Sequence, residues 1–372
     1  METTAIQEVK LYNIKLPLNM QYENSLGVKE DVNSVVIMIT TDNGMVGFSS
    51  LEPDTPNYSE EAWYNVQPLI ENEFIRLIKG EDPFASEVIN RRLNDSVFGH
   101  LMSKALVETA LLDLKGKIVS KPAYELLGGR VNRNLGIVGW VGIGRLESTL
   151  GEIERFLSEG YRCIKVKIGP DVDKDVLTLS EIRKKMGYEF RLRIDANQSL
   201  TRSSSMKLIE KISRLDIDIL EQPVNRLDAD SMRFLNRMSP IPIMADESVV
   251  TKQDMLRIIE LEMASVVKVK VMRNGGVSET RKILAVAEAG GIDCVIGNGF
   301  SSSLGTMVEA TVAATTAWIS RENEFVGPLK LKRDLVREKP EFSKGMIKLR
   351  NGPGFGYTVE DLVPELQSSL NR

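Results

Sequence analysis

Short apolar runs alternate with helical segments through most of the chain. Beyond residue 135, β-type runs end near Trp140, Lys167, Asp195, Glu221, Asp246, Lys270, Gly297 and Glu324. The intervals of 24 to 28 residues each accommodate one strand, one helix and two short loops. Helical periodicity fills the gaps at 146–158, 174–186, 203–215, 252–261 and 278–289. Eight successive βα units predict a (β/α)₈ barrel, since an open doubly wound sheet would not usually contain eight evenly spaced units.

The first 130 residues follow another pattern. Strand-like runs are expected at 9–16, 32–40 and 45–50, and Asp42-Asn43-Gly44 predicts a hairpin turn between the last two. The polar stretches at 17–30 and 51–59 are expected to be loops. A broad apolar face at 101–119 predicts a helix. This part of the chain is therefore predicted to form a small α+β unit.

Composition and charge exclude several classes of function. The 372 residues include 48 Lys and Arg against 52 Asp and Glu, which gives no basic field for nucleic-acid binding. The N-terminus has no signal-peptide pattern and no apolar run reaches about 18 residues, so we expect a cytoplasmic protein without membrane contact. Two cysteines, Cys163 and Cys294, argue against disulfide frameworks and thiolate zinc sites. The single histidine, His100, excludes most imidazole-based catalysis.

Charged residues stand at the ends of consecutive predicted strands. In a barrel these positions form the C-terminal rim, where active sites lie. Three acids without a neighbouring His or Cys end three successive strands: Asp195, Glu221 and Asp246. An all-oxygen set of this kind suits a hard divalent cation such as Mg²⁺. Lysines flank the acids, with Lys165 and Lys167 on the preceding strand and Lys270 on the following one.

This combination suits removal of a proton next to a substrate carboxylate. The resulting enediolate concentrates negative charge on the carboxylate oxygens, where bound Mg²⁺ would stabilise it. Lys167 and Lys270 could act from opposite faces, one removing the proton and the other returning it, which inverts the stereocentre. Lys165 shares a strand face with Lys167. We expect its charge to help lower the pKa of Lys167 from about 10.4 toward about 7–8.

These residues belong to an ordered set of motifs that resembles the enolase superfamily, and within it the muconate-lactonizing-enzyme subgroup. The motifs are Lys-Val-Lys at 165–167, Asp-Ala-Asn-Gln at 195–198, Glu-Gln-Pro at 221–223, Ala-Asp-Glu at 245–247, Lys270 with the following Val-Met-Arg-Asn-Gly-Gly, Gly-Pro-Leu at 327–329 and Gly-Pro-Gly-Phe-Gly at 352–356. The resemblance covers nearly the whole chain. It implies a modified barrel at 131–327 and an α+β capping domain at 1–130, which a C-terminal segment at 328–372 completes.

The resemblance also implies roles for individual residues. Mg²⁺, or alternatively Mn²⁺, would be bound by Asp195, Glu221 and Asp246. Lys167 and Lys270 would form the acid/base pair, while the loops at 17–30 and 51–59 would close over a small carboxylate substrate. The family further suggests a homo-oligomer.

Six further residues are assigned to substrate binding or to support of the metal ligands: Asn197, Glu247, Lys268, Asn298, Glu324 and Tyr58. Lys268 stands where many relatives carry Asn or another short polar residue, so an additional cation is expected inside the barrel. Dipeptide epimerases of the subgroup carry Asp-x-Asp where this chain has Glu324-Phe-Val. The loss of one acid argues against a free α-ammonium on the substrate.

We therefore predict an isomerase that racemises or epimerises an N-substituted amino acid or a related carboxylate. The same residues with one active lysine could instead support a muconate-type cycloisomerisation, o-succinylbenzoate synthesis or a hydroxyproline-type dehydration, and the sequence leaves these outcomes open. Two other classes are a Schiff-base aldolase, which leaves the three acids unexplained, and a non-catalytic barrel that binds a carboxylate.

Overall fold

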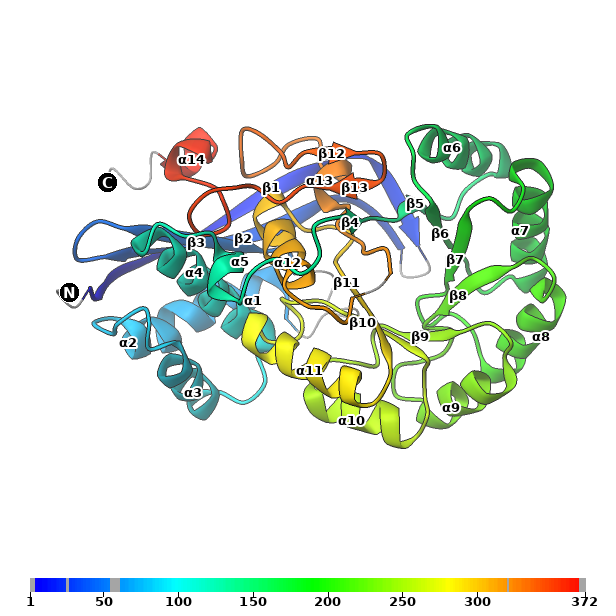
Figure 1. The fold of residues 1–372 in the computed structure, drawn as a ribbon, viewed down its shortest axis with the longest axis horizontal. Coiled ribbons are helices and arrows are strands. Elements are labelled where there is room, and N and C mark those ends of the chain that lie inside the picture. Colours follow the sequence, from blue (N-terminus) through cyan, green and yellow to red (C-terminus); the bar gives the residue numbers. More distant parts are fainter. Residues whose placement is uncertain (1–3, 25–26, 54–60, 320, 368–372) are drawn as a thin grey trace.

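A three-stranded antiparallel sheet in the order β1-β2-β3 forms the base of the cap (Figure 1). The structure is a computed structural model, and it describes residues 4–24, 27–53, 61–319 and 321–367. The strands are β1 (Ile6–Asn24), β2 (Gly27–Thr41) and β3 (Val46–Leu51). The cap helices are α1 (Trp63–Leu69), a π-helical turn (Ile70–Phe74), α2 (Ile75–Ile78), α3 (Ser86–Ser96), α4 (Leu101–Ile118) and α5 (Ala123–Leu126). The predicted 101–119 helix is thus confirmed as α4.

Helix α4 is buried on nearly all sides, because it lies between the cap sheet and the barrel. It approaches β3 closely at Gly47, where a Cβ atom would collide with the Leu114 side chain. On its other side, the Glu108 carboxylate accepts hydrogen bonds from the backbone N–H of Val277 (2.6 Å) and Ser278 (2.9 Å). These two residues begin barrel helix α11 (Val277–Ala289). The negative charge of Glu108 stabilises the N-terminus of α11. Because Glu108 belongs to the cap and α11 to the barrel, this contact holds the two parts together.

The loop predicted at 17–30 is wrong, because β1 and β2 continue as a hairpin as far as Asn24 and Gly27. Pro17 does not stop β1, since β1 is the edge strand of the cap sheet and an edge strand tolerates proline. The extension is polar because most of its side chains face solvent. Its end reaches the barrel beside β5 (Gly139–Val141; Figure 1), where the Ile143 N–H donates to the Glu23 carbonyl oxygen at 3.2 Å.

Seven parallel strands form the barrel wall in sequence order, which confirms the predicted α/β architecture. They are β5 (Gly139–Val141), β6 (Cys163–Lys167), β7 (Arg191–Asp195), β8 (Ile217–Glu221), β9 (Ile243–Ala245), β10 (Val266–Val269) and β11 (Asp293–Ile296). The outer helices are α6 (Leu146–Ser158), α7 (Val172–Met186), α8 (Arg202–Ile212), α9 (Ala229–Met238), α10 (Lys252–Glu260), α11 and α12 (Ser303–Ala314). Figure 1 shows α6 to α11 around the outside of the strands.

The eighth barrel position is not a regular strand, which corrects the expected run ending at Glu324. The segment still bridges the two ends of the sheet: the Glu324 N–H donates to the Ile296 carbonyl oxygen at 3.0 Å, and the Val138 N–H donates to the Asn323 carbonyl oxygen at 3.0 Å. The Asn323 side chain also accepts from the Ile296 N–H at 2.9 Å. A side-chain bond therefore replaces part of the backbone ladder, and the ring closes with Glu324 at its C-terminal rim.

The C-terminal segment runs back along the barrel to the cap. It contains α13 (Gly327–Lys330), β12 (Phe342–Ser343), β13 (Met346–Ile347) and α14 (Pro364–Gln367), and β13 pairs with β4 (Leu135–Gly136). The Phe355 N–H donates to the Asp113 carboxylate of α4 at 2.9 Å.

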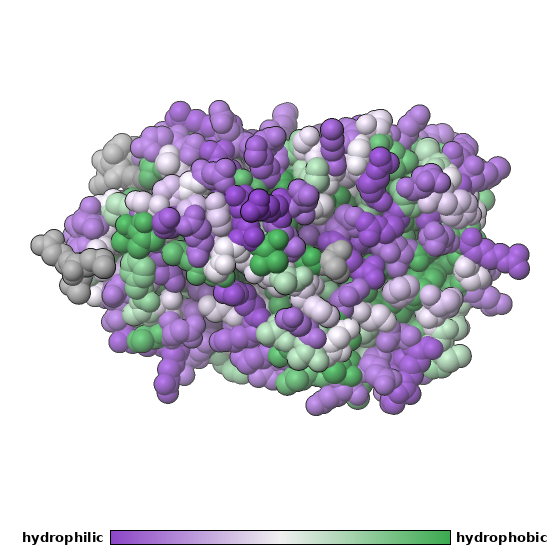
Figure 2. Space-filling view, in the orientation of Figure 1, coloured by the Kyte–Doolittle hydropathy of each residue, from purple (hydrophilic) through white to green (hydrophobic). Residues whose placement is uncertain are grey.

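Figure 2 shows that hydrophilic residues dominate one face of the molecule. None of the helices that the structure describes combines the length and apolar character needed to span a bilayer.

Candidate active site

The C-terminal ends of the barrel strands enclose a small pocket of about 50 Å³. Its lining includes residues predicted from the sequence: Lys165, Lys167, Asp195, Asn197, Asp246, Lys268, Lys270, Asn298 and Glu324. Strand register explains part of this convergence, because Lys167 lies beside Asp195 and Asp195 beside Glu221 on adjacent parallel strands. The pocket is small because lysine–carboxylate contacts occupy much of the space between the strand ends.

The two lysines of β6 share one carboxylate. Asp195 Oδ2 lies 3.0 Å from Lys165 Nζ and 2.6 Å from Lys167 Nζ. Lys167 also donates to Asn197 Oδ1 at 2.6 Å, and Lys165 donates to Glu324 Oε2 at 2.8 Å. Burial alone would lower the pKa of Lys165, but attraction by Glu221, Glu324 and Asp195 raises it well above its ordinary value. Lys165 is therefore a fixed cation beside Lys167.

The lysines of β10 contact the carboxylates on the other side. Lys268 Nζ lies 3.0 Å from Glu221 Oε1 and forms an ion pair with Glu324. Lys270, directly after the strand, places Nζ 2.9 Å from Asp246 Oδ2. Burial lowers the pKa of Lys270, and nearby Arg273 and Lys268 act in the same direction. The additional cation expected at position 268 thus does point into the barrel.

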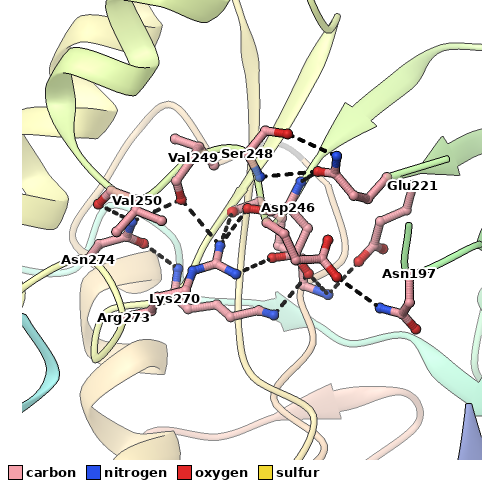
Figure 3. Close-up of polar contacts among 12 residues, drawn as sticks. Asn197, Glu221, Asp246, Ser248, Val249, Val250, Lys270, Arg273 and Asn274 are labelled. Carbon is pink, nitrogen blue, oxygen red and sulfur yellow. Dashed lines mark hydrogen bonds and ion pairs between the residues drawn. The ribbon is translucent and has the colours of Figure 1, made fainter. Parts of the chain in front are cut away.

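Arg273 fixes the position of Asp246 (Figure 3). Its guanidinium donates to Asp246 Oδ1 at 2.7 Å and to the Asp246 carbonyl oxygen at 2.6 Å. Asn274 continues this network by donating to the Val250 carbonyl oxygen and accepting from the Lys270 N–H. Burial alone would raise the pKa of Asp246, but Lys270, Arg273 and Lys268 hold it well below its ordinary range.

The carboxylates repel one another despite the lysines. Burial raises the pKa of Glu221 to about 8, and the negative charge of Asp195 contributes to the increase. Burial also raises the pKa of Glu247, with repulsion from Asp246 and Asp195 adding to the effect. Glu247 accepts from Asn197 Nδ2 at 3.3 Å through Oε1, whereas its buried Oε2 has no hydrogen-bond partner among the residues described. Glu221 and Glu247 therefore hold protons more readily than exposed carboxyl groups do.

This donor set fits a hard cation chemically, although its carboxylates are paired with ammonium groups here. Within the described ranges, no three carboxylate, imidazole or thiol groups are already arranged as a metal site. Lys165 and Lys268 instead bridge the acids. A divalent ion bound by Asp195, Glu221 and Asp246 would replace part of this countercharge.

The remaining predicted residues have mixed placements. Asn298 lines the pocket and accepts from the Phe300 N–H at 3.2 Å, so it also shapes the loop after β11. Tyr58 and the other residues of the second expected loop from position 54 to 59 lie outside the described residues. The first part of that loop is not exposed, because Glu52 and Pro53 are buried at the end of β3.

Several pocket residues were not assigned from the sequence. Tyr22 comes from the hairpin extension, Phe300 from the loop after β11 and Lys330 from α13. Burial lowers the pKa of Lys330 to about 7, while attraction by Glu324 partly opposes this decrease. A lysine that interrupts the apolar sequence Gly-Pro-Leu-Lys-Leu was an available signal. Tyr22 gave no such signal, because it lies in a stretch interpreted as a loop.

A buried carboxyl group behind the pocket predicts a pH dependence of stability. Glu309 of α12 is 1% exposed, and burial raises its pKa to about 8. In the unfolded chain the pKa of a Glu carboxyl is about 4.3. The neutral Glu309 carboxyl therefore makes its full contribution to stability below about pH 4.3, and this contribution is lost as pH rises through the folded pKa. Glu309→Gln mimics the neutral acid. Its free energy of unfolding should therefore rise relative to the unaltered protein between about pH 5 and about pH 8.5. A pH-independent difference in urea unfolding would contradict this assignment.

Comparison with known proteins supports the architecture and the family. Two protein-family models match the chain. The family model "Mandelate racemase / muconate lactonizing enzyme, N-terminal domain" matches residues 5–128, and the family model "Enolase C-terminal domain-like" matches residues 149–363. The N-succinyl-L-Arg/Lys racemase of Bacillus cereus is 29% identical over 363 residues, 97% of each chain. The L-Ala-D/L-Glu epimerase of Bacillus subtilis is 30% identical, covering 94% of this chain and 96% of the relative.

Among solved structures, muconate lactonizing enzyme from Pseudomonas fluorescens in complex with muconolactone superposes with a TM-score of 0.94. The two sequences are 28% identical, and the superposition covers 99% of this chain and 100% of the other. Fold, motifs and relatives agree. The chain is therefore an enzyme of the enolase superfamily and belongs to its mandelate racemase / muconate lactonizing enzyme family.

Proposed function

We propose that this enzyme removes the proton α to a substrate carboxylate and returns a proton to the opposite face, so that it racemises or epimerises an N-substituted amino acid or a related carboxylate. The observation that supports this most strongly is the placement of Lys167 and Lys270 in one pocket. With the closing segment counted as the eighth position, β6 and β10 stand second and sixth around the ring. They therefore face each other across the barrel.

In the proposed mechanism the two lysines exchange roles with the substrate enantiomer. The neutral amine of one lysine accepts the α-proton, and the ammonium of the other donates a proton from the opposite face. Asp195 and Asp246, in contact with Lys167 and Lys270, orient the two side chains. Lys165 contributes a positive charge that does not titrate near neutral pH. Mg²⁺, or Mn²⁺, held by the three acids would supply a positive charge. This charge would stabilise the negative charge that develops on the substrate carboxylate.

The names of the relatives support a reaction of this kind without identifying the substrate. One acts on N-succinyl-L-Arg/Lys and another on L-Ala-D/L-Glu, and both names denote inversion at a stereocentre. We test the proposal by incubating the Mg²⁺-loaded protein in D₂O with both enantiomers of a panel of N-acyl amino acids. Proton NMR should show loss of the α-hydrogen signal, and circular dichroism should show racemisation. Absence of exchange across the panel would contradict the proposed reaction.

A cycloisomerase is the second candidate, because the muconate lactonizing enzyme superposes so completely on this chain. In that case the protein should convert muconate to a lactone, which ultraviolet absorbance measures directly, and leave N-acyl amino acids unchanged. Loss of activity with EDTA would distinguish both candidates from a Schiff-base aldolase, whose substrate would instead be trapped on a lysine by borohydride.

The proposed metal site makes its own prediction. Asp195→Asn should lower the affinity for Mg²⁺ by at least about tenfold, because it removes one anionic ligand from the set. Calorimetric titration with Mg²⁺ measures this directly, and circular dichroism verifies the fold. Asp293→Asn, at the opposite end of a barrel strand, is the matched control and should bind Mg²⁺ normally. Equal affinities of Asp195→Asn and the control would contradict the ligand assignment.

A further inference from the structure

A fifth lysine reaches the pocket from outside the barrel strands. Lys330 ends helix α13, six residues after Glu324, and is only 5% exposed. It lines the same pocket as Lys167 and Lys270. The proposed two-base reaction assigns it no role, because it does not belong to the strands that carry the reacting groups.

Three aromatic rings from separate parts of the chain surround the Lys330 ammonium. Nζ lies 4.4 Å from the ring centre of Phe300 and 5.2 Å from those of Tyr22 and Trp140. Tyr22 also packs edge-on against Phe300, with ring centres 5.8 Å apart. This packing restricts the lysine and leaves its ammonium at the wall of the pocket. Cation–π contacts of this kind stabilise a buried ammonium group.

The nearest acid is already paired with other residues. Glu324 binds Lys165 and Lys268, and no carboxylate of the described residues lies within 4 Å of Lys330 Nζ. Gly299 separates the two groups: a Cβ atom there would lie 3.2 Å from Lys330 Nζ and 3.0 Å from Glu324 Oε1. Even a methyl group at this position would crowd both side chains, so glycine allows the loop backbone to lie close to them. A buried cation without an ion pair is costly, and an anion in the pocket that Lys330 lines would offset the cost.

We propose that Lys330 is a specificity-determining residue that binds a second carboxylate of the substrate, away from the carbon that loses its proton. The substrate is then a dicarboxylate, with one carboxylate beside the rim acids and their cations and the other against Lys330 and the aromatic rings. This inference rests on the proposed function for the use of the pocket as a substrate site. The role of Lys330 in it follows from burial, aromatic packing and the missing ion pair.

The test compares dicarboxylates with monocarboxylates of equal carbon number. Succinate, glutarate and adipate are titrated calorimetrically into the Mg²⁺-loaded protein beside butyrate, pentanoate and hexanoate. At least one dicarboxylate should bind about tenfold more tightly than its monocarboxylate. Lys330→Met should abolish that preference while leaving monocarboxylate affinity unchanged, and Lys330→Arg should retain part of it. Lys330→Met should fold, because it replaces a buried cation with an apolar chain of similar length.

The control variant is Lys332→Met, which makes the same change two residues away at an exposed position. It should keep the preference of the unaltered protein. The inference is overturned if no dicarboxylate is preferred, if Lys330→Met keeps the preference, or if it weakens both ligand classes equally. The last result would place Lys330 at the reacting carboxylate.

This experiment is separable from the test of the reaction. Binding is measured with compounds that need not react, so a preference that depends on Lys330 would stand even if no substrate exchanged its α-hydrogen. Conversely, α-hydrogen exchange with monocarboxylate substrates, together with equal affinities for both ligand series, would support the reaction and exclude the role of Lys330.

Discussion

Replacing either Lys167 or Lys270 by alanine is expected to reduce racemisation by a factor on the order of 10²–10⁴. Each variant loses the group that serves one face of the substrate, so a proton can no longer be removed on one side and returned on the other. The remaining lysine should still remove the proton of one enantiomer. Lys167→Ala and Lys270→Ala should therefore exchange the α-hydrogen of opposite enantiomers, without inverting either.

Proton NMR in D₂O measures this exchange separately for each enantiomer, using any substrate that the unaltered protein racemises. Lys174→Ala is the control, because Lys174 is an exposed lysine on α7 outside the pocket. It should racemise at the normal rate. If either pocket variant inverted its substrate at that rate, or if both exchanged the same enantiomer, the two lysines would not serve opposite faces.

The largest expected effect on stability follows from Asp246→Asn. Asp246 pairs with Arg273 at 2.7 Å and with Lys270 at 2.9 Å, and all three side chains are buried. Because its folded pKa lies well below its ordinary range, this contribution is fully present at neutral pH and is lost only as pH falls through that low pKa. Removing one partner of a buried ion pair costs about 3–5 kcal/mol, because the other charge stays buried.

Urea unfolding at neutral pH in EDTA measures this loss without any contribution from bound metal. The control is Asp293→Asn, since Asp293 pairs with Arg321 at 2.9 Å but both side chains are partly exposed. Its loss should stay below about 1 kcal/mol. Equal losses in the two variants would show that burial does not make the Asp246 cluster exceptional.

The sequence was most informative where local pattern and chemistry coincide. The barrel strands end within a residue or so of their predicted positions, because apolar runs of regular spacing leave little freedom in a parallel sheet. Asp195 and Glu221 are the last residues of their strands, so a correct strand end also placed the side chain. Parallel register then brings such residues together without further information.

Features that depend on contacts across the chain were not predictable in the same way. The extension of β1 and β2 was missed because its polar residues resemble a loop, although pairing and contact with the barrel hold it as a hairpin. The eighth position lacks a regular strand because the side chain of Asn323 takes over a backbone bond. The packing of Lys330 against Tyr22 joins residues about three hundred positions apart, which no local pattern predicts.

The central claim is that Lys167 and Lys270 approach one carbon atom from opposite faces. A crystal structure with Mg²⁺ and a bound N-acyl amino acid whose α-hydrogen is replaced by methyl tests it most directly. We predict that the two Nζ atoms lie on opposite faces of the ligand at its α-carbon. At least one of them should lie about 3–3.5 Å from the α-substituent that takes the place of the reacting hydrogen. Both amines on one side, or either amine directed away from the ligand, would contradict the account.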